Sequence, residues 1–598
     1  MNKSTLEMLT LAALGGSGGG SSVDYPVEAV PITDNTTTMT QVKALIHNIN
    51  AAGRHVFFDV ASINNNQMYL TTIWLDDDTN PTQYRILDAV TGKMKAGRFN
   101  GSDLLKDLLD KAISDFVELT FTLIDAQQTQ PTGLTMTLTD KNDNLYATDT
   151  YNGSPITFLV PRGFEYKLSY PAWDGHKISP PYSVSGYASA DRAYTCNYMI
   201  GSYIYAFHID SNESDPEDAV TYLEDAVGLT PAHMDYENEV FDYGSWENAF
   251  FMPKPCMVKY DGTVDYYLNK NNYAYRADGV TASDVANTEY EGNAMMEWGQ
   301  NGKKIWYKIV PDDGDPTSAT IYVSDSQSDS DFVCWSFYNS DGDVVDHFYT
   351  AIYNGTKVSG SNRMRSLSGM VESTYCDSSN SGVTEAELNN VGTDRIWYAE
   401  VYCDVTLINI LLILMGKSLD SPTTFGYGNG TSRVKLTTGT GDALGMFYGY
   451  STTTSVVKVF GMENWWGNAW RLFVGYLNDN GTLKYKLTRT TADGSTASDY
   501  NFDGTGFLTA NAAPDHSGSW AFAKKMKFAG NQFSVIEVGA SRTTYWCAPC
   551  YFTNNSITHA RHGGSQGDNT SSAFTVSAEH VDWPPYCVLS MKPKLVQP

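Results

Sequence analysis

The chain has 598 residues, which exceeds one hydrophobic core, so we expect about three to five domains. Its 68 acidic residues against 40 basic ones give a net charge of −28, which disfavours nucleic acids and anionic membrane surfaces as partners. Charged residues make up only 18%, whereas 50 glycines and 39 tyrosines indicate short strands joined by many turns. We therefore predict a multidomain, mainly β protein with α+β parts.

Residues 1–22 predict a short anchor helix followed by a flexible tether. Ser4 can cap the helix and Glu7 completes a capping box, while three leucines share one face: Leu6, Leu9 and Leu14. The Gly/Ser run over 15–22 is typical of a tether. An isolated helix this short is marginal in water, so we expect the leucine face to dock onto another protein, with a disordered tail as the alternative. The acidic Glu7 within the apolar stretch does not fit a signal peptide.

The next two segments predict separate modules. Residues 23–116 combine helical and strand patterns and indicate a small α+β module, with strands over 55–60 and 68–75. Residues 117–199 alternate apolar and polar side chains over short, turn-bounded runs. This spacing predicts a β-sandwich that resembles the Ig-like spacer modules of bacterial surface proteins.

We predict that the remaining chain comprises a connecting β-rich region at 200–380 and a head domain at 381–598. The longest apolar run, Val405–Met415, is about half of the ~20 residues that a bilayer requires. We therefore predict a buried helix there and no membrane insertion.

Eight cysteines are too few for a disulfide scaffold in a chain of this length. Cys547 and Cys550 have the spacing of a redox motif, but the strand-like and loop-like flanks predict buried thiols instead. The run Asp140-x-Asn142-x-Asn144 begins like a calcium loop, yet Leu145 stands where glycine is required. We expect no metal and no cofactor.

The most distinctive segment is the tryptophan motif, Gly461–Trp470. Its rings predict a locally packed core, and its turn residues predict an irregular backbone. An Arg-x-Gly-Gly-Ser motif follows about a hundred residues later. We expect the three tryptophans to be mostly buried and the polar residues to satisfy nearby loops; the structural motif residues are Glu463, Asn464, Trp465, Trp466, Trp470, Arg561, Gly563, Gly564 and Ser565.

These two motifs resemble the C-type-lectin-like module of phage tail-tip and retroelement-diversified receptor-binding proteins. The order of segments over 200–598 is similar to that of gut-bacteriophage tail and fibre proteins. In the resembled proteins the module is a scaffold that displays side chains for binding. Formylglycine-generating enzymes carry a related pattern, but their cysteine pair does not map onto Cys547 and Cys550, so that oxidase activity is not carried over.

Enzyme motifs give little support for catalysis. The chain lacks the His-Glu-x-x-His and the phosphate-binding Gly-x-x-x-x-Gly-Lys-Ser/Thr patterns. His559 and His562 are the one tight histidine pair, but their loop-rich flanks predict no metal site. Paired carboxylates leave a glycan depolymerase open as an alternative, although no β-helix repeat is present.

The resemblance implies a non-enzymatic head or tail fibre on the surface of a tailed bacteriophage. Other virion proteins would bind its N-terminus, a host-surface glycan or protein would bind its C-terminal domain, and a homotrimer is expected. The alternatives are a virion-associated glycan depolymerase and a bacterial surface lectin.

The binding surface is predicted on late loops and strands of the module. Tyrosine and tryptophan supply contact area at low entropic cost, and short polar side chains supply adaptable hydrogen bonds. The alternative is that Tyr545 and Trp546 alternate across one strand, so that one of them packs the core. The predicted binding residues are Arg542, Tyr545, Trp546, Tyr551, Asn554 and Asn555.

Overall fold

The computed structural model describes residues 116–595, except 126, 142–143, 174, 179–182, 374–380, 517, 554–555 and 580–584, together with the backbone of five strands between 56 and 104. The predicted anchor with Leu6, Leu9 and Leu14 lies outside the described residues, as do Asn554 and Asn555.

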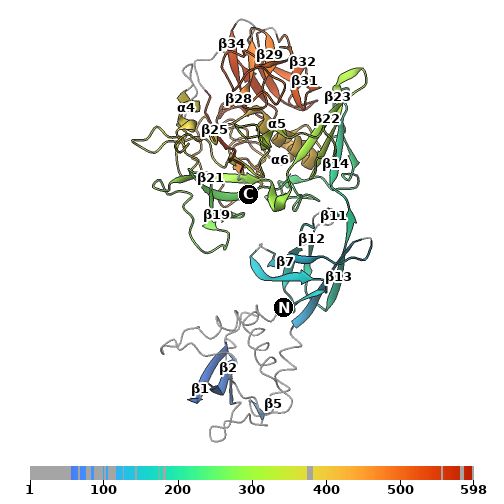
Figure 1. Cartoon of the computed structure of the whole chain (residues 1–598), viewed down its shortest axis with the longest axis vertical. Helices are drawn as coiled ribbons and strands as arrows, with labels where there is room; N and C mark the ends of the chain where they lie inside the picture. The colour runs from blue at the N-terminus through green and yellow to red at the C-terminus, as the bar shows by residue number, and fades with distance from the viewer. Residues whose placement is uncertain are drawn as a thin grey trace. The chain divides into compact units, whose positions relative to one another are not determined.

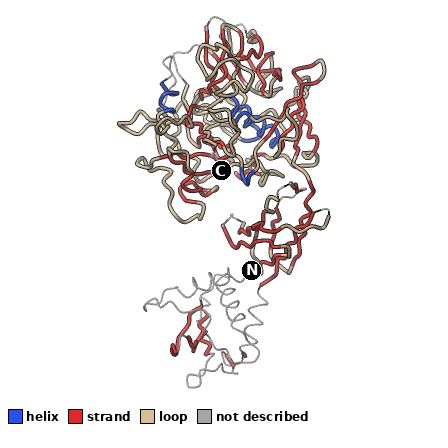
Figure 2. Tube along the Cα trace, in the orientation of Figure 1, coloured by secondary structure: helices blue, strands red, loops and turns tan. Residues whose placement is uncertain are grey.

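The described chain is mainly β, as predicted, with several sheets and few helices (Figures 1 and 2). Its contacts divide it into two compact units, Met1–Gly201 and Ser202–Pro598.

The first unit begins with two small antiparallel sheets. Strands were predicted over 55–60 and 68–75, and both are confirmed as β1 and β2. The sheets are β1-β2-β3 and β4-β5, with bounds β1 (Val56–Asn64), β2 (Gln67–Leu75), β3 (Thr82–Arg85), β4 (Arg98–Phe99) and β5 (Asp103–Leu104).

Two four-stranded sheets follow in the same unit, in the orders β12-β10-β7-β8 and β11-β13-β6-β9. On β6 the residues Leu119, Phe121 and Leu123 are buried and alternate with polar residues. The Leu123 N–H donates to the hydroxyl of Tyr151 on β8 at 3.2 Å, so the two sheets face each other. The strands are β6 (Phe116–Asp125), β7 (Thr132–Asp140), β8 (Leu145–Asn152), β9 (Ile156–Pro161), β10 (Glu165–Ser169), β11 (His176–Ile178), β12 (Ser183–Tyr187) and β13 (Arg192–Ile200).

The second unit contains three larger sheets and two short hairpins. The four-stranded sheet has the order β15-β14-β23-β22, and the hairpins are β16-β17 and β26-β27. The bounds are β14 (Ile204–Ile209), β15 (Val220–Glu224), β16 (His233–Asp235), β17 (Val240–Asp242), β22 (Trp306–Asp312), β23 (Asp315–Ser324), β26 (Lys458–Val459) and β27 (Met462–Glu463).

A seven-stranded sheet joins distant parts of this unit in the order β20-β19-β18-β21-β24-β36-β25. Because β36 lies between β24 and β25, the ranges 200–380 and 381–598, which were predicted separately, share one sheet. The strands are β18 (Lys254–Lys259), β19 (Val264–Asn269), β20 (Asn272–Arg276), β21 (Gly292–Trp298), β24 (Phe348–Ala351), β25 (Trp397–Ala399) and β36 (Leu589–Met591).

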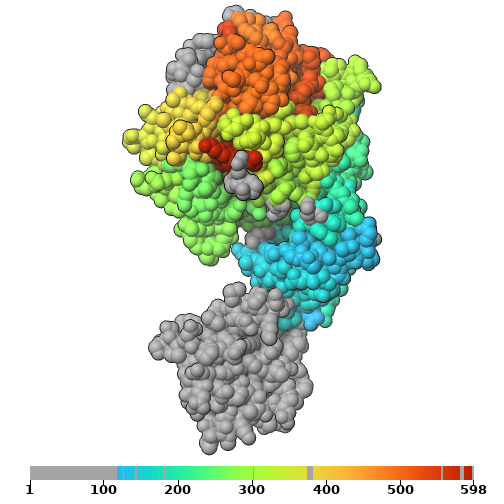
Figure 3. All heavy atoms as spheres, viewed as in Figure 1, coloured from blue at the N-terminus to red at the C-terminus, as the bar shows by residue number. Residues whose placement is uncertain are grey.

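An eight-stranded sheet in the order β30-β29-β28-β34-β35-β33-β31-β32 carries most of the C-terminal sequence. Its labelled strands lie together in Figure 1, and the orange residues that include them form one continuous outer surface in Figure 3. The strands are β28 (Arg471–Asp479), β29 (Thr482–Tyr485), β30 (Leu508–Ala512), β31 (Ala521–Ala529), β32 (Gln532–Val538), β33 (Pro549–Phe552), β34 (Ile557–His562) and β35 (Val576–Ala578).

The predicted buried helix is confirmed as α5 (Tyr402–Gly416), every residue of which is buried. It contacts β14, β28 and β32, so it lies between two of the larger sheets. Burial on all sides explains why the sequence shows an apolar run instead of one apolar stripe. The short helices α4 (Ser381–Glu387) and α6 (Ser421–Phe425) flank it in sequence.

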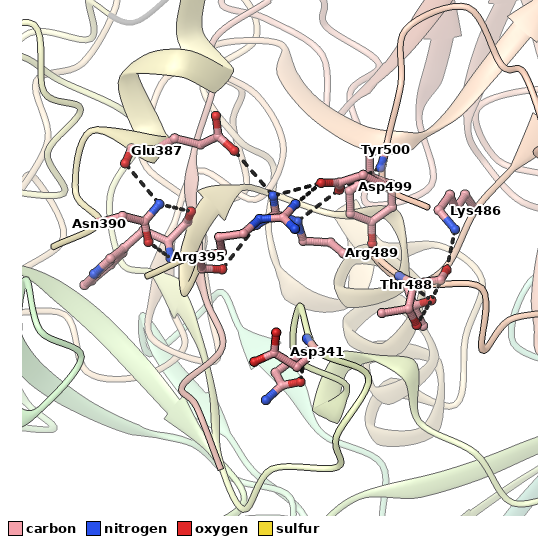
Figure 4. A network of polar contacts seen from close by, with 12 residues as sticks. Asp341, Glu387, Asn390, Arg395, Lys486, Thr488, Arg489, Asp499 and Tyr500 are labelled. Carbon is pink, nitrogen blue, oxygen red and sulfur yellow. Dashed lines mark hydrogen bonds and ion pairs between the residues drawn. The ribbon is translucent and has the colours of Figure 1, made fainter. Parts of the chain in front are cut away.

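A polar network fastens the segment between β29 and β30 to the rest of the unit (Figure 4). Arg489 binds Asp499 through Nε at 3.0 Å, donates to the carbonyl of Arg395 at 3.2 Å and packs over the ring of Tyr398 at 4.1 Å. It also reaches Glu387 of α4 at 3.4 Å. One guanidinium therefore joins this segment to α4 and to β25.

Candidate functional site

The tryptophan motif forms the predicted local core. Trp465 and Trp466 are 0% exposed, so their predicted burial is confirmed. The Trp465 indole donates to Oδ1 of Asn409 on α5 at 3.0 Å, and that of Trp466 donates to the Gly426 carbonyl at 3.0 Å. Each ring therefore has its polar atom satisfied inside the protein.

The polar residues of the motif hold a neighbouring loop. The Glu463 carboxylate accepts from the backbone N–H of Gly439 at 2.9 Å and of Gly441 at 2.6 Å. The Asn468 side chain accepts from the Leu436 N–H at 2.8 Å. Asn464 differs from the prediction: its Oδ1 has no partner among the described residues, and its role is a left-handed turn at φ 53°.

The Arg-x-Gly-Gly-Ser motif packs directly against the tryptophan motif. The Gly467 N–H donates to the Gly563 carbonyl at 2.8 Å. Gly563 has φ 85°, and a Cβ there would lie 2.7 Å from the Trp465 carbonyl oxygen. The two motifs, distant in sequence, thus form one structural core.

Three charged or polar groups are buried beside this core. Arg471 binds both carboxylate oxygens of Glu400, and His562 Nε2 lies 3.0 Å from Glu400 Oε2. Burial alone would raise the pKa of Glu400, but Arg471 and His562 outweigh it and hold that pKa below its usual value. Burial lowers the pKa of His562, which indicates a neutral ring that donates from Nε2.

A cavity of about 40 Å³ lies next to this cluster, with volume for a few water molecules. Its lining is mainly apolar and contains no carboxylate; it includes His562 together with Tyr402, Phe473, Phe533 and Phe574. The cavity therefore lacks the carboxylate pair that a glycosidase requires.

The end of the tryptophan motif reaches the surface, where it joins a row of aromatic rings. Trp470 is half-buried, and its ring stacks on that of Trp520 with centroids 5.7 Å apart and an interplanar angle of 25°. Trp520 is 45% exposed and contacts Tyr551 at 5.5 Å, and Tyr551 contacts His516 at 4.5 Å. These four residues are called the ring row below.

The ring row is assembled from three parts of the eight-stranded sheet. Trp470 directly precedes β28, Trp520 directly precedes β31, and Tyr551 lies on β33. Tyr551 projects from the face opposite Cys550 and Phe552, which are both buried. The row begins beside Arg561, whose guanidinium lies over the Trp470 ring at 4.4 Å.

The structure brings only some of the predicted binding residues to this surface. Tyr551 belongs to the ring row, whereas Arg542 is exposed and Tyr545 is partly exposed near Lys524. The prediction for Trp546 is wrong. Its ring is 1% exposed and stacks on Phe533 at 5.7 Å, so it is a core residue.

Sequence reasoning missed Trp520 and His516. Both stand in a short polar segment between β30 and β31, in which Gly518 and Ser519 immediately precede Trp520 and are exposed. A tryptophan after small turn residues is poorly placed for burial, and that local signal could have indicated an exposed ring.

The described residues contain no group of three or more side chains suited to a metal ion, and no helix among them is long and apolar enough to cross a membrane. Cys547 and Cys550 are buried free thiols, as predicted. Burial raises the pKa of Cys550 to about 12, so its thiol stays protonated and unreactive.

Comparison with known proteins gave no matching family model and no matching curated protein. Among solved structures, the C-terminal fragment of the pilus adhesin SpaC from Lactobacillus rhamnosus GG is 10% identical, with 22% of this chain and 58% of that chain covered and a TM-score of 0.12. The Bacillus anthracis TIE protein is 11% identical, with 36% and 38% covered and a TM-score of 0.14.

The streptococcal ancillary pilin is 8% identical, with 44% of this chain and 86% of that chain covered and a TM-score of 0.15. The chain thus spans less than two thirds of the SpaC fragment and of the TIE protein. TM-scores this low carry no argument about function.

Proposed function

We propose that this chain is a non-enzymatic recognition protein, a fibre on the surface of a tailed bacteriophage, and that the ring row is its contact surface for the host. The virion assignment, the N-terminal attachment and the homotrimer come from the sequence resemblance. The ring row is the observation that carries the binding function.

The rings have the properties of a recognition surface. Large exposed aromatic residues are uncommon on surfaces that only face water, and contiguous ones mark interaction sites. Trp470 and Tyr551 are partly covered by Trp520, so the rings are held in place before a ligand arrives. A preformed surface loses less conformational entropy when it binds.

The two candidate sites, a small apolar cavity and a surface row of rings, favour a binding role over the depolymerase alternative. The cavity beside His562 is small and has no carboxylate in its lining. The ring row is a partly exposed surface, and the carboxylate beside its Trp470 end, Glu579, is ion-paired with Arg561 at 2.5 Å.

Adsorption of the purified, fluorescently labelled full chain to a panel of bacterial isolates tests the proposal. We expect wild-type chain to adsorb to at least one isolate and Trp520→Ala to lose most of that adsorption. Trp306→Ala is the matched control, because Trp306 is a partly exposed tryptophan on β22 outside the ring row. Equal adsorption by Trp520→Ala and wild type would refute the assignment.

A further inference from the structure

The ring row offers two indole N–H groups as well as ring faces. Among the described residues, no acceptor pairs with Nε1 of Trp470 or of Trp520, whereas the buried Trp465 and Trp466 both have acceptors. A ligand that provides both an apolar face and hydroxyl oxygens would satisfy the rings and these donors together.

Charge near the row favours an uncharged ligand. Arg561 is the cation at the Trp470 end, and its guanidinium is bound by Glu579 at 2.5 Å. The whole chain carries a net charge of −28, so a polyanion would be repelled. This surface therefore provides no strong attraction for an anionic ligand.

Backbone pairing argues against an extended peptide. The strands that carry the row, β28, β33 and β31, each have a neighbour on both sides in the eight-stranded sheet. A peptide could not add itself as an edge strand here, because each of these strands already has a partner strand on both sides. Binding must use the side chains that project from the sheet.

We infer that the ring row binds a neutral glycan, with the C–H face of a sugar stacked on Trp520 and sugar hydroxyls accepting from the two indole N–H groups. This inference rests on the proposed function and names the ligand class of the same site. A pyranose has an apolar C–H face, which suits the negative face of an aromatic ring, and hydroxyl groups around its edge.

The deciding experiment uses bacterial cells to which the wild-type chain adsorbs. The cells are treated either with periodate, which cleaves the vicinal diols of sugars, or with a broad protease. We expect periodate to abolish adsorption and protease to leave it unchanged. Adsorption that survives periodate and is lost after protease would overturn the glycan inference while leaving the binding role of the row intact. Adsorption by Trp520→Ala at the wild-type level would instead refute the proposed function.

A second measurement tests neutrality. Adsorption at about 0.1 M NaCl is compared with adsorption at about 1 M NaCl, where charge attraction is screened. We expect less than a twofold change, and a tenfold loss would show a charged ligand. Trp520→Phe, which keeps an aromatic face but removes the indole donor, should retain weaker binding than wild type and stronger binding than Trp520→Ala. Equal binding by the phenylalanine and alanine variants would show that ring stacking is not used.

Discussion

Trp466 and Trp520 show two uses of the same side chain, one in the core and one at the surface. Trp466 is fully buried, and its indole donates to Gly426. Trp520 is 45% exposed and has no acceptor among the described residues. Trp470 closes the tryptophan motif that contains Trp466, and its ring stacks on that of Trp520. The difference teaches that the motif builds a core and also positions one ring at the surface.

Trp466→Ala should have the largest effect on stability. Removing a fully buried indole leaves a cavity and the unpaired Gly426 carbonyl, so we expect a loss of about 3–5 kcal/mol in the free energy of unfolding. Urea unfolding followed by circular dichroism measures this loss. A loss below about 1 kcal/mol would mean that the core collapses around the missing ring and that the comparison with Trp520 is wrong.

Asn468→Ala should lower the free energy of unfolding by less, about 2–3 kcal/mol, because a buried hydrogen-bond network loses its central side chain. Asn468 accepts from the Leu436 N–H and donates to Glu372 at 2.9 Å. It also has φ 60°, which alanine adopts with strain. Asn480→Ala is the control, since Asn480 has φ 49° but is exposed. The difference in lost stability between Asn468→Ala and Asn480→Ala measures the contribution of the buried hydrogen bonds. Equal losses in the two variants would mean that these bonds do not stabilise the fold.

The sequence predicted the buried tryptophans better than the exposed ring row. Burial of Trp465 and Trp466, and of the helix α5, could be inferred because local composition alone decides it. Trp546 could not be placed, because positive φ angles of 57° at Tyr545 and 49° at Cys547 replace strand alternation by a turn. The ring row depends on the strand order β28-β34-β35-β33-β31, which brings residues 470, 520 and 551 together. No local pattern encodes that order.

The pH dependence of stability should report His559 on β34, which is partly buried and packs against the ring of Phe502 at 4.1 Å. Burial lowers the pKa of His559 to about 4, against 6.5 for the free side chain. The unfolded chain therefore binds a proton that the folded chain does not, and stability is lost as pH falls below about 6.5 towards 4. We expect this histidine to account for about 2 kcal/mol of lost stability between pH 7.5 and pH 5.

The comparison of wild type with His559→Gln isolates this contribution, because glutamine does not titrate in the range. Urea unfolding at pH 7.5 and pH 5 should show a smaller difference in the variant by about 2 kcal/mol. The same pH difference in both proteins would mean that the His559 ring is accessible to protons in the folded state.

Trp520→Ala should have the smallest effect on stability, below about 1 kcal/mol, although it removes a ring as large as that of Trp466. Nearly half of the Trp520 side chain is already in water, and no hydrogen bond of its indole is lost. The stacking on Trp470 and the tilted contact with Tyr551 contribute the stability that remains to be lost. Urea unfolding of this variant beside Trp466→Ala gives the measurement. A loss as large as that of Trp466→Ala would make the ring row part of the core, and the loss of adsorption by Trp520→Ala could then be ascribed to unfolding. A small loss of stability together with lost adsorption would instead show that Trp520 serves binding and not folding. A ring that adds little to stability yet remains at the surface is explained by a ligand that it contacts.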